Sequence, residues 1–136
     1  MKTRIVVVAI IENKDKILIG KKAKGVGPYP DLWQIPGGGA NIETESLEEA
    51  IKREIREEAG IEVFNIKPVS FDEDYTKNKQ NEMVHYIFLQ FHAFTKEDKI
   101  TPGDDIEHLE WIKKSELNKY QYCPPLGKLF KKLNLI

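Results

Sequence analysis

Residues 39–61 read GANIETESLEEAIKREIREEAGI, and this stretch decides the fold. Ser46 with Glu49 three residues later is a capping-box pattern, so we expect a helix to begin there. Gly60 is well placed to end this helix in a left-handed conformation. The stretch therefore predicts one helix between these residues, preceded by a glycine-rich segment.

The second half of this helix carries three acids, Glu54, Glu57 and Glu58. At about 100° per residue, Glu54 and Glu58 fall inside the apolar arc of the helix, and Glu57 lies at its edge. Like charges three or four residues apart repel by roughly 0.2–0.5 kcal/mol per pair, and acids near a helix C-terminus oppose its dipole. A hard divalent cation would offset both costs, because Mg²⁺ takes oxygen ligands.

Two alternatives stay open at this point. The acids can form an ordinary solvated face, with Arg53 neutralising Glu57 or Glu49 across one turn. The glycines at 37–39 can form a tight connection, or a loop that supplies carbonyl oxygens to a metal or amides to a phosphate. A loop of this kind next to an acidic helix favours the metal.

The rest of the chain predicts mostly strands. We expect a hairpin of residues 5–11 and 17–21, a second strand pair of residues 61–71 and 82–94, and short strands at 32–35 and 106–112. A C-terminal helix is indicated by helical spacing of Leu126, Leu129, Phe130 and Leu133. Strands with interspersed helices predict an α/β fold, a mixed sheet covered by helices. The length of 136 residues favours one domain over residues 1–136.

Composition excludes several classes of function. The formal net charge of −1 shows no excess of basic residues of the kind that binds nucleic acid. Cys123 is the only cysteine, which excludes an intrachain disulfide and a cysteine-rich zinc site. The apolar run 5–11 is too short to span a bilayer, and the N-terminus lacks a signal-peptide pattern, so we expect a cytoplasmic protein without a membrane partner.

Taken together, Gly39, Glu45 and the run REIREEAGI at residues 53–61 match a complete Nudix box in residue type and spacing. The chain therefore resembles the Nudix hydrolase family, and the likeness extends more loosely to residues 32–38 and 109–111. The resemblance implies an α/β/α sandwich with a mixed sheet. It also implies a hydrolase that cleaves a diphosphate bond in a nucleoside-diphosphate-linked small molecule.

The resemblance further implies a metal site. By position in the box, Glu54, Glu57 and Glu58 would hold Mg²⁺, or Mn²⁺ as a substitute, and the carbonyl of Gly39 would complete the site. Arg53 would orient these carboxylates.

Two further roles come from the same resemblance. Glu45 would support the box, and Glu54 is the first candidate for the base that accepts the proton of the attacking water. The family often has a further acid later in the chain, where this sequence has Asp104, Asp105 and Glu107. The closest match is Asp105, which makes it the second candidate.

The substrate is less well indicated. A (deoxy)nucleoside triphosphate is the first expectation; ADP-ribose or another nucleotide sugar, a non-catalytic nucleotide-sensing module, and a structural metal site are the alternatives. The oligomeric state is left open. We expect the lysines of the segment at residues 21–24 to lie on a solvated hairpin end, although they could meet phosphates. Candidates to stack on a base are Tyr29, Trp33, Phe71, Phe88 and Tyr120.

Overall fold

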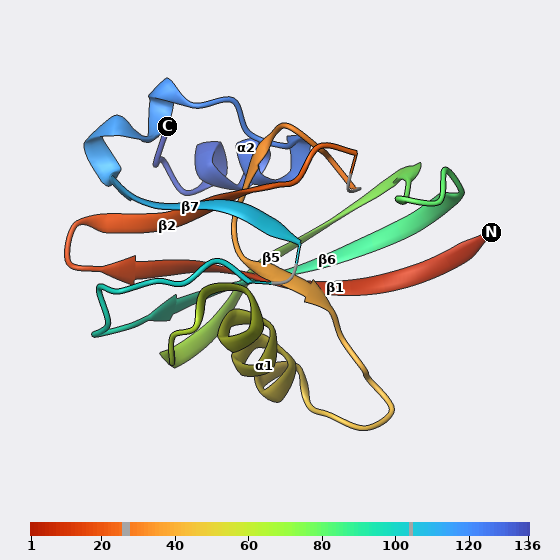
Figure 1. The fold of residues 1–136 in the computed structure, drawn as a ribbon, viewed down its shortest axis with the longest axis horizontal. Helices are drawn as coiled ribbons and strands as arrows, with labels where there is room; N and C mark the ends of the chain where they lie inside the picture. Colours follow the sequence, from red (N-terminus) through yellow and green to blue (C-terminus); the bar gives the residue numbers. More distant parts are fainter. Residues whose placement is uncertain (26–27, 104) are drawn as a thin grey trace.

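A mixed sheet forms the middle layer of the protein, with helix α1 on one side and helix α2 on the other (Figure 1). The computed structural model describes residues 1–25, 28–103 and 105–136. No helix within these ranges is long and apolar enough to cross a membrane. In chain order the elements are β1 (Lys2–Asn13), β2 (Lys16–Lys22), β3 (Trp33–Gln34), β4 (Gly37–Gly39), α1 (Leu47–Ala59), β5 (Phe64–Lys77), β6 (Met83–Phe94), β7 (Ile106–Lys113), a 3₁₀ helix (Lys114–Lys119) and α2 (Pro124–Lys132).

The centre of the sheet is a parallel pair, β1 and β6, in register from Lys2 opposite Val84 to Glu12 opposite Phe94. β5 continues the sheet as the antiparallel neighbour of β6, which confirms the second predicted strand pair. The sheet order is β3-β2-β1-β6-β5, with β4 also paired to β1 and β7 to β2. The prediction of a mixed sheet flanked by helices is confirmed.

The two strands of the predicted first hairpin form, but they pair with each other only next to their turn. β1 and β2 pair at two positions, Glu12 opposite Ile17 and Asn13 opposite Lys16. Beyond them the strands diverge, because β2 takes β7 and β3 as neighbours and β1 takes β4. The space opened by this divergence is where the cavity described below lies.

The sequence signals for α1 are confirmed at both ends. The Ser46 hydroxyl accepts the Glu49 N–H at 3.1 Å, and the Glu49 carboxylate accepts the Ser46 N–H at 2.8 Å. Gly60 has a φ of 69° and donates its N–H to the Arg56 carbonyl at 3.0 Å. The apolar side of the helix packs on β1 and β6 through a cluster that includes Ala50, Ile51, Ile55, Ala59, Val7, Ala9, Ile11, Phe91 and Ala93.

Helix α2 covers the opposite side of the sheet. Three of the four residues predicted for its apolar stripe, Leu126, Leu129 and Phe130, are buried against β1 and β2 residues such as Ile10 and Ile17. Leu133 caps the helix at its C-terminus. With both faces of the central strands covered, the sheet can carry the long apolar runs seen in the sequence.

The glycines at 37–39 form a strand, not the expected loop. β4 pairs antiparallel with β1, with Val8 opposite Gly37 and Val6 opposite Gly39. Gly37 has a φ of 156°, and a Cβ there would collide with the Val7 carbonyl oxygen. A Cβ at Gly38 would collide with the Glu54 carboxylate. The glycines thus allow close approach of β4 to β1 and α1.

Candidate active site

A cavity of about 350 Å³ lies where β1 and β2 diverge. α1 contributes Glu54 and Glu58 to its wall, and β4 contributes the three glycines. Strands β1, β2 and β6 and the turn at residues 78–80 form the remaining sides. The other side chains along the wall are Arg4, Val6, Val8, Lys22, Pro28, Gln34, Ile35, Asn78, Lys79, Gln80, Tyr86, Phe88, Asp105 and Ile106.

Glu54 and Glu58 are buried, with exposed fractions of 9% and 5%. The Glu58 Oε1 accepts the Gly37 N–H at 2.8 Å, and the Glu54 Oε1 accepts an Arg53 Nη1–H at 2.8 Å. Buried carboxylates need such partners, because desolvation of an isolated charge is very costly. The solvated-face interpretation therefore fails for these two acids.

Arg53 connects the acidic helix to the strand and loop that precede it. Its guanidinium donates to both oxygens of Glu45, at 2.9 and 2.6 Å, and to the Gly39 carbonyl at 3.1 Å. The same group donates to Glu54 and, at 3.3 Å, to Glu57. Glu45 and then Glu54 raise the pKa of Arg53, and the hydrogen bonds from Arg53 and from the Asn41 N–H lower the pKa of Glu45 to about 2. Arg53 is thus a fixed cation at the centre of four box residues.

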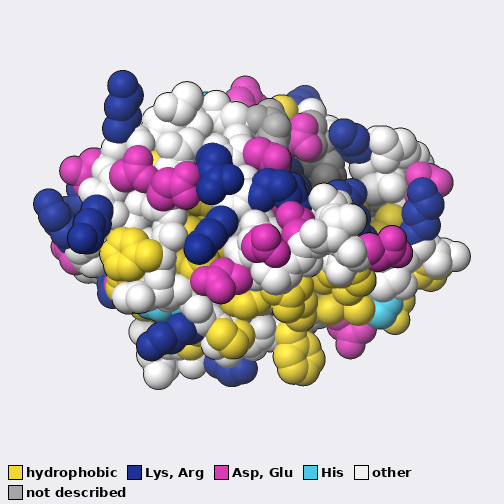
Figure 2. All heavy atoms as spheres, turned by 90° about the horizontal axis from the view of Figure 1, so that it is seen from below, with side chains coloured by type: hydrophobic (Ala, Val, Ile, Leu, Met, Phe, Trp, Pro, Cys, Tyr) yellow, Lys and Arg dark blue, Asp and Glu magenta, His cyan; other side chains and the backbone are white. Residues whose placement is uncertain are grey.

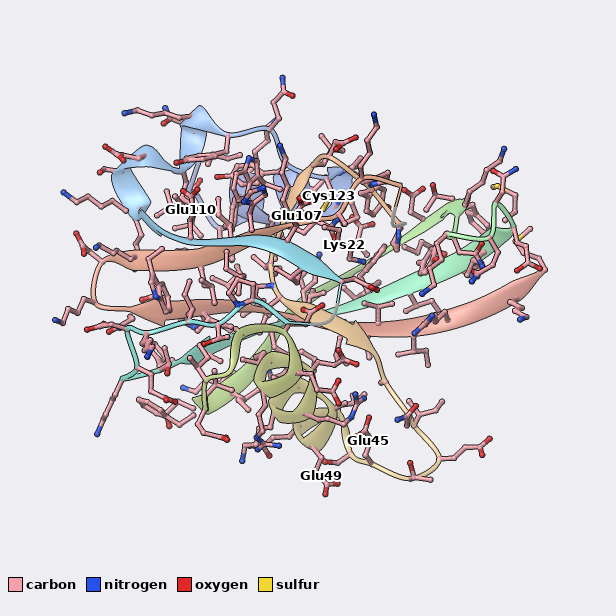
Figure 3. The ribbon with its side chains drawn as sticks, viewed as in Figure 1. Lys22, Glu45, Glu49, Glu107, Glu110 and Cys123 are labelled. Carbon is pink, nitrogen blue, oxygen red and sulfur yellow. The ribbon has the colours of Figure 1, made fainter. Side chains whose placement is uncertain are left out.

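Glu45 lies just before the N-terminus of α1, and Figure 3 shows it near Glu49 in the first turn of the helix. Glu45 also accepts the Asn41 N–H at 3.0 Å, so it fixes the backbone of the loop before α1. Glu49 belongs to the capping box and is not a partner of Arg53 in the described contacts. Of the two neutralising pairs considered for Arg53 from the sequence, the one with Glu57 is observed.

Glu57 differs from the other two acids because its side chain is 44% exposed and turned toward Arg53. Within residues 1–25, 28–103 and 105–136, no group of three or more His, Cys, Asp or Glu side chains is arranged to hold a metal ion. A site of three carboxylates here requires the Glu57 side chain to turn from Arg53 toward Glu54 and Glu58. The donor chemistry itself fits Mg²⁺, since carboxylate oxygens surround the end of the cavity and the Gly39 carbonyl keeps a second lone pair.

The acid predicted outside the box also reaches the cavity. Asp105 lies along its wall just before β7, and the Asp105 carbonyl accepts the Ala23 N–H at 3.2 Å. Glu107 is exposed on β7 and is not among the described lining residues (Figure 3). Asp104 lies outside the described residues.

Two cations, Arg4 and Lys22, line the same cavity as the acids. Lys22, at the end of β2, is partly buried and lines the cavity, so the expected solvated hairpin end is wrong for this lysine. Burial lowers the pKa of Lys22, while the negative charges of Glu58 and Asp105 oppose that shift. Arg4, on β1, lies close to Gly39 of β4. A Cβ atom added to Gly39 would collide with the Arg4 guanidinium.

Arg4 was not among the residues expected at a site. The signal was present, because Arg4, Val6 and Val8 alternate along one strand and alternate residues of a strand share a face. What the sequence could not show is that these side chains line a cavity that Glu54 and Glu58 of α1 also reach, on the face of β1 opposite to the one on which α1 packs.

Comparison with known proteins agrees with this arrangement. A family model described as the NUDIX domain matches residues 1–133. The chain belongs to the Nudix family. The nucleoside triphosphatases NudI of Enterobacter sp. (strain 638) and Klebsiella pneumoniae (strain 342) are each 32% identical, over 124 and 127 residues. The first alignment covers 87% of both chains, and the second covers 88% of this chain and 89% of the relative.

Solved structures show the same Nudix fold. The MutT protein from Bacillus halodurans aligns with a TM-score of 0.74 at 26% identity, covering 94% of this chain and 80% of that one. The NUDIX domain of Shewanella oneidensis NrtR, solved with ADP ribose, aligns with a TM-score of 0.77 at 14% identity, covering 98% and 88%. This protein is therefore a Nudix hydrolase by family and by fold, as the box predicted.

Two of the five aromatic candidates lie at the site of this Nudix protein. Phe88 lines the cavity. Tyr29 and Phe88 both line a smaller adjoining pocket of about 30 Å³. Trp33 and Tyr120 pack edge to face against each other, with ring centroids 5.5 Å apart. Phe71 is exposed on the edge strand β5. Of these five candidates, Tyr29 and Phe88 are the two that line the cavity or its adjoining pocket.

Proposed function

We propose that this Nudix hydrolase cleaves a (deoxy)nucleoside triphosphate to the monophosphate and pyrophosphate, using Mg²⁺ or Mn²⁺. The observation that carries the proposal is the pairing of buried acids, Glu54 and Glu58, with the cations Arg4 and Lys22 in one cavity. The acids suit a divalent metal, and the cations of the same cavity suit the oxygens of a polyphosphate.

Glu54, Glu57 and Glu58, with the Gly39 carbonyl, are the proposed metal ligands. When bound, the metal would neutralise phosphate oxygens and favour formation of a nucleophilic hydroxide. Arg53 keeps Glu54 and the Gly39 carbonyl in fixed positions through its hydrogen bonds at 2.8 and 3.1 Å. Such fixed positions matter because misplacement of a reacting group by about 1 Å can cost on the order of 10²-fold in rate.

The remaining steps fall to other side chains of the cavity. Lys22 and Arg4 would bind phosphate oxygens that face away from the acids. Glu54 is our first candidate to accept the proton of the attacking water, and Asp105 is the second, since both lie along the cavity wall.

The choice of a nucleoside triphosphate is supported by the relatives named nucleoside triphosphatase, which this chain matches over nearly their whole length. ADP-ribose is the second candidate, because the NrtR NUDIX domain was solved with that ligand and shares the fold. A sensing module without activity is disfavoured by the intact set of box acids. On the face seen in Figure 2, basic and acidic side chains are interspersed and do not gather by sign, which favours a small substrate over a nucleic acid.

The test is a panel of ribo- and deoxyribonucleoside triphosphates and ADP-ribose, incubated with Mg²⁺ or Mn²⁺ and resolved by anion-exchange chromatography. We expect a monophosphate and pyrophosphate from at least one triphosphate, and no products in excess chelator. Glu58→Gln should abolish this turnover, whereas Glu48→Gln, an exposed change on the same helix, should preserve it. Turnover that persists in chelator, or intact triphosphates beside cleaved ADP-ribose, would contradict the proposal.

A further inference from the structure

Tyr29 joins one wall of the site to strand β5, which is far away in the sequence. It lies in the segment at residues 28–31, between β2 and β3, and its hydroxyl donates to the Asp74 Oδ2 on β5 at 2.5 Å. Asp74 Oδ1 accepts the Tyr75 N–H at 2.9 Å, so its carboxylate is fixed on both oxygens. The Tyr29 ring is thereby held over the sheet at the side of the cavity.

The backbone of this segment is held in a conformation that its residues rarely adopt. Tyr29 and Asp31 have φ angles of 58° and 66°, in the left-handed region. For residues with a Cβ this costs roughly 1 kcal/mol or more, and such strain persists only where surrounding contacts enforce it. Gln34 supplies contacts of that kind, because its Nε2 donates to the carbonyls of Pro28 at 3.2 Å and Tyr29 at 2.9 Å.

The Tyr29 ring lies at the apolar end of the site. Its centroid is 6.2 Å from that of Phe88, at an interplanar angle of 35°. The small pocket that Tyr29 lines shares four residues with the main cavity, so the two are continuous: Val8, Gln34, Ile35 and Phe88. The carboxylates of α1 line the main cavity and do not line the small pocket. The recess of about 30 Å³ is itself too small for a heterocycle, so a base attached to a polyphosphate would lie in the adjoining end of the main cavity, with the Tyr29 recess as its apolar side.

On the basis of the nucleotide hydrolysis proposed above, we propose that Asp74 is a positioning residue that fixes the Tyr29 ring as a wall for the substrate's base. Asp74 itself does not line either space in the described part of the chain, so it acts through Tyr29. Burial and the hydrogen bond to Asp74 both raise the pKa of Tyr29. The phenol therefore stays protonated and keeps donating throughout the neutral range.

A role in positioning the base and a role in stabilising the fold predict different changes in KM and in melting temperature. A wall for the base contributes to binding of the whole nucleotide, in the ground state and in the transition state alike. Loss of such uniform binding raises KM and leaves kcat unchanged. Loss of a merely structural contact would lower the melting temperature without a matching change in KM.

The test compares Tyr29→Phe, Asp74→Ala and Asp74→Asn, with Tyr75→Phe as the control on an exposed neighbouring tyrosine. For the best triphosphate substrate we expect Tyr29→Phe and Asp74→Ala to raise KM roughly fivefold to tenfold, with kcat within about twofold. Asp74→Asn should restore KM to within about threefold of the wild type, because the amide oxygen still accepts from the phenol. Tyr75→Phe should behave as the wild type.

Calorimetric binding of the nucleoside monophosphate product without metal gives a second readout, in which the same variants should weaken binding by similar factors. Unchanged KM and product affinity in Tyr29→Phe and Asp74→Ala would overturn the inference while the proposed hydrolysis stands. An equal rise of KM in Asp74→Asn and Asp74→Ala would also overturn it. A wild-type protein that neither binds nor cleaves any nucleotide would instead remove the proposed function, and the inference with it.

Discussion

Replacement of Arg53 by lysine tests how far the site depends on one guanidinium. Five hydrogen bonds are described for this group, four of them to carboxylates: two to Glu45, one to Glu54 and one to Glu57, with the fifth to the Gly39 carbonyl. A lysine has a single nitrogen, so it cannot reach both oxygens of Glu45 and also the other acids. Charge is kept, and only the forked geometry is lost.

The expected magnitude follows from the number of bonds lost. The Arg53 side chain is 28% exposed, and two or more charge-assisted bonds disappear, which gives a loss of about 1–3 kcal/mol in the free energy of unfolding. At about 3–4 °C per kcal/mol for a chain of this size, the melting temperature falls by about 3–12 °C. Because the carboxylates and the Gly39 carbonyl lose their common anchor, kcat should fall on the order of 10²-fold.

The assay combines thermal melting by circular dichroism with steady-state hydrolysis of the best nucleotide. Arg56→Lys is the matched control, since Arg56 on the same helix also forms a forked pair, with Glu62, but both side chains are more than half exposed. Exposed pairs contribute about 0–1 kcal/mol, so this control should change little. If Arg53→Lys melts and turns over like Arg56→Lys, Arg53 does not organise the site.

Three further outcomes follow from the geometry. In steady-state kinetics with Mg²⁺, Glu57→Gln should lower kcat on the order of 10²-fold, whereas Glu48→Gln should change it less than about threefold; equal small losses would place the metal elsewhere. Gly38→Ala should lower kcat about tenfold or more, because its Cβ would collide with the Glu54 carboxylate, and an unchanged rate would contradict that contact. The pKa of Glu45 is held at about 2, below its ordinary value, so its stabilising effect is present above that ordinary value and lost as the pH falls toward 2. Melting temperatures across this acid range should fall less steeply in Glu45→Gln than in the wild type, and parallel curves would refute the pairing.

The parts of the site that local signals specify could be predicted from the sequence. Ser46, Glu49 and Gly60 define the ends of α1 through hydrogen bonds within a few residues, and the structure confirms them. The helical period also places Glu54 and Glu58 on the buried side, where the structure has them. These features depend on neighbours in the chain, which a sequence pattern can express.

The parts that depend on distant pairing could not be predicted. The parallel register of β1 with β6 joins segments about eighty residues apart, and it places Arg4 opposite Tyr86, which lines the same cavity. The pairing of β4 with β1 brings the Gly37 N–H to Glu58 and makes a strand of an expected loop. The position of Lys22 on the cavity wall likewise follows from the divergence of β2 from β1. None of these contacts has a signature within one segment of the chain.

The central claim, that the acids of α1 hold the divalent metal, is tested most directly by titrating Mn²⁺ and counting free ion by electron paramagnetic resonance. The wild type and Glu48→Gln should bind Mn²⁺ with the same affinity. Glu54→Gln combined with Glu58→Gln should weaken binding by on the order of 10²-fold or more, since two carboxylate ligands are lost. Equal Mn²⁺ affinity in the wild type and this double variant would contradict the account.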